Sequence, residues 1–373
     1  MQLGFDAKRL FHNKTGLGNY SRTLLANLAT FYPEHDYHLY TSSIPESAIA
    51  ESYSTASYQT HTSDTFLPSL WRTRGIVKDI RRDSIQVYHG LSNELPYGIS
   101  RSKAASVVTI HDLIYYRLPH TFRWPDRKIY HAKTKHACQV ADHIVAISES
   151  TKADILDIFQ VDVAKISTVY QACHSTYYEK ASTKEVGQIQ AKYDLPTDFI
   201  LHVGTIEPRK NLTQILHALA EMPTDIRPPL VVVGRGKKFL AEAKSLQQAL
   251  KLPHVHWLHD VESNIELRAI YAAARLLVYT SHYEGFGLPL VEAQLQSTPV
   301  IASAVSSLPE AAGPHSTLVS PTDTAELAHR IEQLLGDTKA MKSLGAVSQA
   351  FAMKHFSPQK TAAAMMPIYQ KLS

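Results

Sequence analysis

The chain has 373 residues, of which 44% are hydrophobic and 19% are charged, and this balance is that of a soluble globular protein long enough for two domains. The net charge of +4 is weak and scattered, and without zinc-finger spacing, an RNP-like strand or a sustained Lys/Arg block it does not favour nucleic-acid binding. No apolar run is long enough to span a bilayer, no signal peptide is apparent, and Cys138 and Cys173 form no CxxC pattern, so we expect a cytoplasmic, reduced protein.

The first half of the chain alternates strand and helix patterns. Residues 2–6 predict a strand, and the loop after it carries Gly16 and Gly18 before a helix over about 20–31. The glycines resemble part of a dinucleotide fingerprint, but Ser21 occupies the third glycine position, so the motif is weak. We interpret the loop as one whose backbone approaches a ligand; a plain strand-to-helix turn is the alternative. Further strands are predicted at 37–40, 85–89, 105–110, 144–147 and 166–170, with a polar, irregular excursion at 42–64.

Two segments of this half are rich in Lys and Arg. Residues 71–82 place cations beside Trp71, Ile76 and Ile80, a pattern that fits a helix lying on an anionic membrane, although a solvated helix with one buried stripe explains it better. The helix expected over 124–138 carries a second set of cations. Such a surface would suit a lipid-linked diphosphate. We therefore consider the inner face of the cytoplasmic membrane as a partner, to which the protein would bind peripherally.

His111 directly follows the strand predicted at 105–110. Open α/β sheets bind ligands at the carboxyl ends of their strands, so this histidine is well placed for chemistry. The adjacent Asp112 is a candidate to orient the imidazole; the alternative is a histidine satisfied within the core. Further along, Ser148 is expected to cap a helix over 149–159.

The second half follows a polar stretch, 175–196, which we interpret as a linker. It begins with a strand at 199–203 and continues into Glu207-Pro208-Arg209-Lys210-Asn211. We expect Asn211 to cap the next helix, with Arg209 and Lys210 beside its free amide groups. Two cations at a helix start suit a diphosphate. Strands at 230–233 and 255–258 follow, the latter ending at His259.

The stretch 276–302 reads as a strand, a glycine loop, a helix and a second strand. Glu284 lies in the loop, Gly285 and Gly287 permit close backbone approach, and Glu292 lies about one turn into the helix. Two carboxylates around such a loop indicate a ligand site. The alternative is a tight turn with one solvated carboxylate and one that favours the helix dipole.

Two motifs carry a family resemblance. Glu-Gly-Phe-Gly-Leu-Pro at 284–289, followed by Glu292-Ala293, and Glu-Pro-Arg-Lys-Asn at 207–211 resemble the signature of the retaining GT-B glycosyltransferases of family 4. The resemblance covers nearly the whole chain, most strongly its second half. It implies an α/β fold of two Rossmann-like domains facing a central cleft. These are an acceptor-binding domain over 1–175, a nucleotide-sugar domain over 196–355, and a terminal helix, 356–373, that crosses back to the first domain.

The resemblance also implies roles for individual residues. Glu284 would lie against the donor sugar, Glu292 would hold the ribose, and Arg209 and Lys210 would bind the diphosphate. His111 would line the sugar pocket, which makes the candidate catalytic residues His111, Glu284, Arg209 and Lys210. The remaining donor-binding candidates are the glycines of the first loop and the residues after Glu284, namely Gly16, Gly18, Gly285, Phe286, Gly287 and Leu288. The family commonly has glycine where His259 and Ser297 stand; Ser297 looks structural, whereas His259 would alter the floor beneath the nucleobase, and its role stays open.

The implied reaction is retaining transfer of a hexose from a nucleotide sugar to a glycan or lipid-linked saccharide in bacterial polysaccharide or lipopolysaccharide synthesis. Residues 4–10 and 15–20 look most like family members that use GDP-mannose. No Asp-x-Asp pair is present, so we expect no metal and no cofactor, with the leaving phosphate stabilised by cations and amides. The alternatives are a UDP-sugar donor, a sugar-nucleotide epimerase, and a non-catalytic carbohydrate-binding protein.

Overall fold

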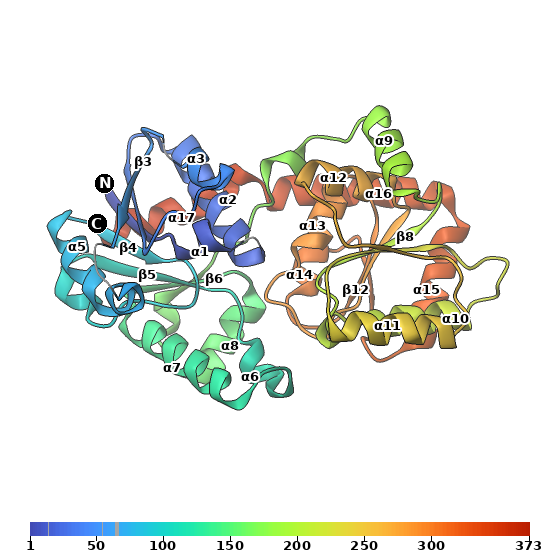
Figure 1. Ribbon diagram of the computed structural model, residues 1–373, viewed down its shortest axis with the longest axis horizontal. Helices are drawn as coiled ribbons and strands as arrows, with labels where there is room; N and C mark the ends of the chain where they lie inside the picture. The colour runs from blue at the N-terminus through green and yellow to red at the C-terminus, as the bar shows by residue number, and fades with distance from the viewer. Residues whose placement is uncertain (14, 54, 64–66) are drawn as a thin grey trace. The chain divides into compact units, whose positions relative to one another are not determined.

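The computed structural model describes residues 1–13, 15–53, 55–63 and 67–373. The chain divides into two compact units. The first unit comprises Met1–Ala172 together with Pro358–Ser373, and the second comprises Cys173–Ser357. Each unit is a parallel sheet flanked by helices (Figure 1), as the resemblance to GT-B proteins implies.

In the described part of the first unit, seven parallel strands form a sheet in the order β3-β2-β1-β4-β5-β6-β7. They are β1 Gln2–Asp6, β2 Asp36–Thr41, β3 Tyr58–Thr62, β4 Val87–Gly90, β5 Ala105–Ile110, β6 His143–Ala146 and β7 Ile166–Thr168. The helices are α1 Lys8–His12, α2 Gly16–Phe31, α3 Ala48–Ser52, α4 Pro68–Leu70, α5 Ile76–Arg82, α6 Ile114–Arg117, α7 Trp124–Val140, α8 Glu149–Phe159 and α17 Pro358–Leu372. Short turns complete the unit, namely η1 Trp71–Gly75, η2 Ile99–Ser102, η3 Pro119–Thr121 and η4 Val163–Lys165.

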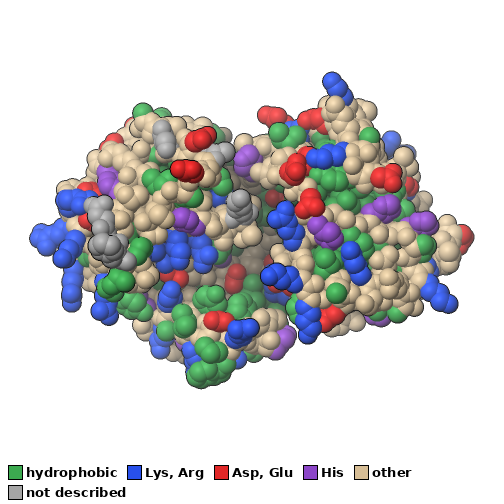
Figure 2. Space-filling view, viewed as in Figure 1, with side chains coloured by type: hydrophobic (Ala, Val, Ile, Leu, Met, Phe, Trp, Pro, Cys, Tyr) green, Lys and Arg blue, Asp and Glu red, His purple; other side chains and the backbone are tan. Residues whose placement is uncertain are grey.

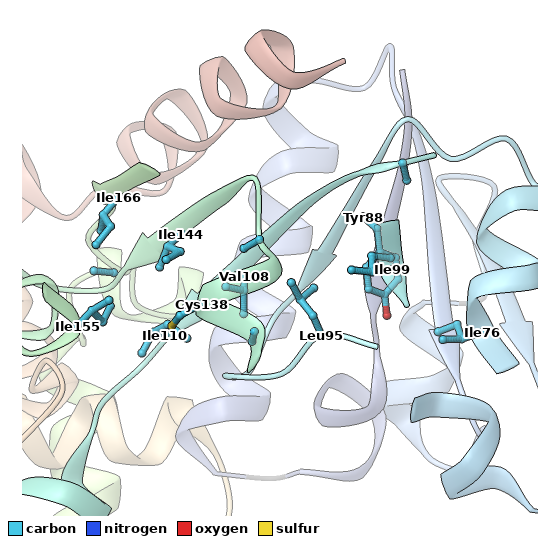
Figure 3. Packing of buried hydrophobic residues seen from close by; sticks show 14 of the residues in the cluster. Ile76, Tyr88, Leu95, Ile99, Val108, Ile110, Cys138, Ile144, Ile155 and Ile166 are labelled. Carbon is cyan, nitrogen blue, oxygen red and sulfur yellow. The ribbon is translucent and has the colours of Figure 1, made fainter. Parts of the chain in front are cut away.

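One core of the first unit lies between this sheet and the helices on one of its faces. Figure 3 shows Val108 and Ile110 of β5, Ile144 of β6 and Cys138 of α7 packed together. Burial of such side chains contributes roughly 1.5–3 kcal/mol each. Both cysteines are free and buried. The terminal helix α17 packs against α2 and belongs to the first unit.

In the second unit, the described residues form six parallel strands in the order β10-β9-β8-β11-β12-β13. They are β8 Ile200–Val203, β9 Leu230–Val233, β10 Val255–Leu258, β11 Leu276–Tyr279, β12 Val300–Ser303 and β13 Thr317–Val319. The helices are α9 Thr183–Tyr193, α10 Leu212–Glu221, α11 Lys238–Ala249, α12 Asn264–Ala273, α13 Leu288–Leu295, α14 Leu308–Ala312, α15 Thr324–Gly336 and α16 Thr338–His355. Two single turns, η5 Ser175–Tyr178 and η6 Pro208–Lys210, lie before α9 and α10.

The segment expected to be a linker instead carries a helix of the second unit. Helix α9 begins at a capping box, in which Ser182 and Glu185 satisfy each other's backbone amides. Glu185 also pairs with Arg268 of α12. Local capping and a tertiary ion pair thus order a stretch that has little apolar periodicity.

The excursion expected at 42–64 is also more regular than predicted. Helix α3 and strand β3 lie within it, and β3 pairs in parallel with β2, placing Tyr58 opposite Tyr37. An edge strand keeps one side towards solvent, so its polar Ser/Thr-rich composition concealed it. Residues 54 and 64 of this segment lie outside the described residues.

Helix α2 begins earlier than the apolar periodicity predicts. Asn13 Oδ1 accepts hydrogen bonds from the amides of Thr15 (2.8 Å) and Gly18 (3.3 Å), so Gly16 and Gly18 form the first turn of the helix instead of a loop. A Cβ at Gly18 would come within 1.8 Å of the Asn13 carbonyl oxygen, whereas one at Gly16 would meet nothing within 4 Å. Contact with its own chain therefore explains Gly18, without a ligand.

Ser297, where the family commonly has glycine, has a positive φ of 63°. L-residues other than Asn and Asp seldom adopt this conformation. Its carbonyl oxygen also lies 2.2 Å from where a Cβ at Gly345 would be. The departure at Ser297 thus lies at a strained turn packed against α16.

Candidate functional site

The strand order of the second unit brings the two sequence motifs together. Strands β8 and β11 are parallel neighbours, with Leu276 opposite Ile200. Arg209 and Lys210 follow β8 in the turn η6, and Glu284 follows β11. Since parallel neighbours end at the same edge of a sheet, residues about 75 positions apart in the sequence become neighbours there. The amide of His282 also donates to the Arg209 carbonyl at 2.8 Å and ties the two loops to each other.

Glu284 is paired with both cations at once. Its Oε1 lies 2.6 Å from Lys210 Nζ and its Oε2 lies 2.7 Å from Arg209 Nη1. The hydroxyl of Tyr279, the last residue of β11, accepts from Lys210 Nζ at 2.5 Å and donates to Glu284 Oε1 at 3.1 Å. Glu207 adds a second carboxylate, 2.6 Å from Arg209 Nη2.

These contacts hold the cluster in its charged form. Burial alone would raise the pKa of Glu284, but the charges of Lys210 and Arg209 outweigh it and lower the pKa to about 2. The same carboxylate outweighs the effect of burial on Lys210 and raises its pKa. The cluster is therefore fully ionised near neutral pH.

Two serines hold the backbone around Glu284. Ser306 Oγ accepts from the Glu284 amide at 3.0 Å, and Ser307 Oγ donates to the carbonyl oxygens of Glu284 (2.9 Å) and Phe286 (3.0 Å). Neither serine was singled out from the sequence, because a Ser-Ser pair after a strand is an ordinary loop composition. The signal that would have found them is their place at the carboxyl end of β12, beside β11.

The glycine loop behaves as its composition predicts, except at Phe286. Gly285 is buried in the loop, and Gly287 has φ +114° and lies directly before Leu288, the first residue of α13. L side chains rarely adopt this φ, so a substitution at Gly287 would be strained and glycine is favoured there. The Phe286 ring is buried against Phe356 at a centroid distance of 5.4 Å, so its role is in the core of the unit.

The prediction that the Asn211 side chain caps α10 is wrong. It has φ +56° and its side chain makes no cap hydrogen bond. Its Nδ2 instead donates to the carbonyl oxygens of Thr280 (3.0 Å) and Pro321 (2.8 Å). Asn211 therefore fastens the start of α10 to the loop after β11, because an amide can reach across a left-handed turn.

Glu292 lies on α13 and has a different environment from Glu284. Its Oε2 accepts from the Tyr271 hydroxyl at 2.8 Å. Burial raises the pKa of Glu292 to about 7, and the Tyr271 hydrogen bond only partly opposes this. The pKa of Glu284 is thus lowered and that of Glu292 is raised, although both lie in one loop-helix segment. Shifted pKa values of this kind are frequent at functional sites.

His259, whose role the sequence left open, joins two strand ends. Its Nδ1 lies 2.9 Å from the Gly234 carbonyl oxygen, and Arg235 Nε donates to the His259 carbonyl at 2.9 Å. Its side chain thus connects the loops after β9 and β10.

His111, in the first unit, is a buried neutral imidazole at the end of β5. Its Nε2 donates to the carbonyl oxygen of Leu91 at 2.8 Å, and its ring meets the Tyr20 ring edge-on at 4.6 Å. Burial lowers the pKa of His111 to about 4. The Leu91 carbonyl therefore sets the tautomer, a role for which Asp112 was only a candidate. Asp112 Oδ1 accepts from the amide of Ile114 instead.

Across the residues that the structure describes, no three His, Cys, Asp or Glu side chains lie in an arrangement that could hold a metal ion. In the same part of the chain, none of the helices has both the length and the apolar composition needed to cross a membrane.

Comparisons with known proteins agree with this architecture. The family model described as Glycosyltransferase Family 4 matches residues 14–174, and the one described as Glycosyl transferases group 1 matches residues 188–350. O-antigen chain mannosyltransferase B of Escherichia coli is 30% identical over 356 residues, which are 90% of this chain and 91% of that protein. Anabaena HepE in complex with UDP-glucose has a TM-score of 0.77 at 16% identity, covering 99% of both chains. A glycosyltransferase from Rickettsia africae has a TM-score of 0.76 at 17% identity, covering 99% of this chain and 98% of that one.

The family models and the 30% identical relative show a glycosyltransferase, and the two parallel sheets and the structural neighbours show a fold of the GT-B type. The chain belongs to the group 1 glycosyltransferases, and it resembles mannosyltransferases of bacterial O-antigen synthesis.

The raised pKa of Glu292 predicts a pH-dependent stability difference. The carboxyl has a pKa of 4.5 in the reference state and about 7 in the folded protein, so the folded state loses stability relative to the unfolded state as pH rises from about 4.5 through 7. Glu292→Gln removes this loss. We expect the variant to gain stability over the wild type between pH 5 and pH 8, by on the order of 1.4 kcal/mol per pKa unit, measured by thermal unfolding.

Glu242→Gln, which alters an exposed carboxylate of α11, is the control and should show no comparable trend. A Glu292→Gln difference that stays constant over this pH range would contradict the assignment.

Proposed function

We propose that the protein is a retaining hexosyltransferase that uses a nucleotide-sugar donor, GDP-mannose in the first instance, and acts in bacterial polysaccharide or lipopolysaccharide synthesis. The observation that carries this proposal is the convergence of Arg209 and Lys210 on Glu284 at one sheet edge. The acceptor is a glycan or lipid-linked saccharide. The E. coli relative supports mannose, because it is an O-antigen chain mannosyltransferase.

The cluster supplies what such a transfer requires. When the bond from the anomeric carbon to the phosphate oxygen breaks, the nucleoside diphosphate leaves with the electron pair, and Arg209 and Lys210 neutralise the charge that develops. The acceptor oxygen forms the new bond to the same carbon, and its proton passes to the departing phosphate. Glu284 receives hydroxyls of the sugar, and Glu292 those of the ribose. His111, neutral at pH 7, contributes a hydrogen-bonding imidazole for the sugar.

Neutralisation of the leaving group by fixed side-chain cations is also the reason for proposing a metal-independent reaction. Two permanent positive charges on η6 take the place that a divalent cation has in other glycosyl and phosphoryl transfers. Loss of transfer in EDTA, with recovery in Mg²⁺, would contradict this part of the proposal.

UDP-glucose is the second donor candidate, favoured by the complex of HepE with that sugar nucleotide. Its low identity to this chain makes the fold the shared property, so mannose remains the first choice. An epimerase or a non-catalytic carbohydrate-binding protein would leave the cations and Glu284 without a transfer to promote.

The donor is tested by calorimetric titration of GDP, UDP and ADP, with GDP-mannose and UDP-glucose, in the absence of metal. We expect measurable binding and a preference for GDP and GDP-mannose, followed by mannose transfer to a mannose-containing saccharide. A preference for UDP would replace the donor but keep the site, and absence of binding to every nucleotide would contradict the proposed function.

Peripheral membrane association is also proposed, at a surface on α7. Trp124 and Ile129 on this helix are 67% and 53% exposed, and Lys128 lies over the Trp124 ring at 5.7 Å. Exposed aromatic and aliphatic side chains beside cations are the composition that enters an anionic membrane surface. Figure 2 shows apolar and cationic side chains next to one another on the first unit.

The segment 71–82, which the sequence also suggested for a membrane, is engaged within the protein. Arg72 is paired with Asp6 at 2.7 Å and Glu94 at 2.9 Å, and Trp71, Ile76 and Ile80 are buried. The apolar stripe of this segment therefore faces the core, which was the favoured alternative.

Sedimentation with vesicles tests the membrane surface. We expect the protein to sediment with vesicles of phosphatidylglycerol but not with vesicles of phosphatidylcholine. The fraction bound to phosphatidylglycerol should fall several-fold in Trp124→Ala/Ile129→Ala. The control is Phe239→Ala/Ile265→Ala, which removes two exposed apolar side chains of the second unit. Equal binding by both double variants would contradict the α7 surface.

A further inference from the structure

The donor cluster is electrically neutral in the ligand-free protein. Arg209 and Lys210 supply two positive charges, and Glu207 and Glu284 supply two negative charges within 2.7 Å of them. A diphosphate that approaches this sheet edge therefore does not meet two uncompensated cations. It meets cations whose strongest hydrogen-bonding positions are already taken by carboxylates.

Glu284 occupies these positions in the manner of a phosphate. Each of its two oxygens pairs with a different cation, Oε1 with Lys210 and Oε2 with Arg209. All three side chains are largely shielded, with exposed fractions of 10% for Glu284, 11% for Lys210 and 15% for Arg209. Charge-assisted pairs in such a setting are strong and directional. Glu284 and a bound diphosphate thus require the same hydrogen-bond donors, Arg209 and Lys210.

The backbone of Glu284 is held independently of its side chain. Ser306 accepts from its amide and Ser307 donates to its carbonyl. An exchange of partners is therefore possible by rotation of the side chain alone, with the loop between β11 and α13 in place. A diphosphate carries at least two negative charges against the single charge of the carboxylate, so it competes favourably for both cations.

We propose that Glu284 is the internal counter-ion of the donor site: the diphosphate displaces its carboxylate from Arg209 and Lys210, and this exchange releases the carboxylate to bind hydroxyls of the transferred sugar. The inference rests on the proposed nucleotide-sugar function. It couples two events, because the carboxylate becomes available to the sugar only when the phosphates are in place. Under this exchange, Glu284 opposes binding of the diphosphate part of the nucleotide sugar and favours binding of its sugar part.

Pyrophosphate is the probe that isolates this exchange, since it has the phosphates and lacks both sugar and base. We expect Glu284→Gln to bind pyrophosphate at least about tenfold more tightly than the wild type, because the variant removes the competing charge but keeps a side chain of the same shape. Glu207→Gln, which removes the more exposed carboxylate on Arg209 alone, should show a smaller gain. Glu242→Gln removes the same charge from a distant helix and should show none.

The same variant should lose sugar transfer with the wild-type donor. Tighter pyrophosphate binding together with lost transfer is a combination that a merely structural ion pair would not produce. Because Glu284→Gln leaves two cations with one carboxylate, its folding is checked by thermal unfolding. Pyrophosphate should raise the midpoint temperature of unfolding more in the variant than in the wild type, because it binds the folded variant more tightly.

Equal or weaker pyrophosphate binding by Glu284→Gln would overturn the inference. If the variant does not fold, a crystal structure of the wild type with pyrophosphate decides instead: Glu284 withdrawn beyond 4 Å from both cations supports the exchange, and Glu284 still paired with both overturns it. The outcome is separable from that of the proposed function. Nucleoside diphosphate binding without the gain in Glu284→Gln contradicts the exchange alone, whereas the absence of all phosphate binding contradicts both.

Discussion

The pairing of one carboxylate with two cations at the edge of the second sheet is the interaction on which the site depends. Burying three charges is costly unless each is paired and hydrogen-bonded, and Glu284 satisfies Arg209 and Lys210 with separate oxygens. The arrangement requires β8 and β11 to be neighbours, because the cations follow one strand and the carboxylate follows the other. Tyr279, from the end of β11, completes it with a hydroxyl that contacts both Lys210 and Glu284.

In the first unit, a buried chain of hydrogen-bonded polar groups lies behind the candidate residue His111. Tyr369 of α17 lies 2.6 Å from His89 Nδ1, and His89 Nε2 lies 2.8 Å from Thr109 Oγ1, which the Tyr20 hydroxyl also contacts at 2.9 Å. The Tyr20 ring then packs against His111. The last helix of the chain thus stabilises the same sheet edge that carries the imidazole, although it joins the unit from the far end of the sequence.

Much of this organisation could be predicted, because its signals are local. Continuous apolar runs such as 230–233 and 276–279 are buried strands of those same bounds, and Ser148 caps α8 as expected. What could not be predicted depends on contacts between distant residues. The ion pairs of Glu284 join positions about 75 residues apart, Ser306 and Ser307 act through their place beside β11, and Asn211 serves the loop after that strand instead of its own helix. Capping of α9 by Ser182 and Glu185 was a local signal that a polar composition obscured.

The central claim is that Arg209 and Lys210 form the phosphate site of the donor, and its most direct test is a calorimetric titration of the nucleoside diphosphate that the wild type binds best into Arg209→Ala/Lys210→Ala. Lys238→Ala/Lys244→Ala, which removes two cations of α11 in the same unit, is the matched control. The account predicts binding at least about a hundredfold weaker in the first variant, because two charge-assisted contacts are lost and the Glu284 carboxylate remains without its two cations, and unchanged binding in the control. Wild-type affinity in Arg209→Ala/Lys210→Ala would contradict the account.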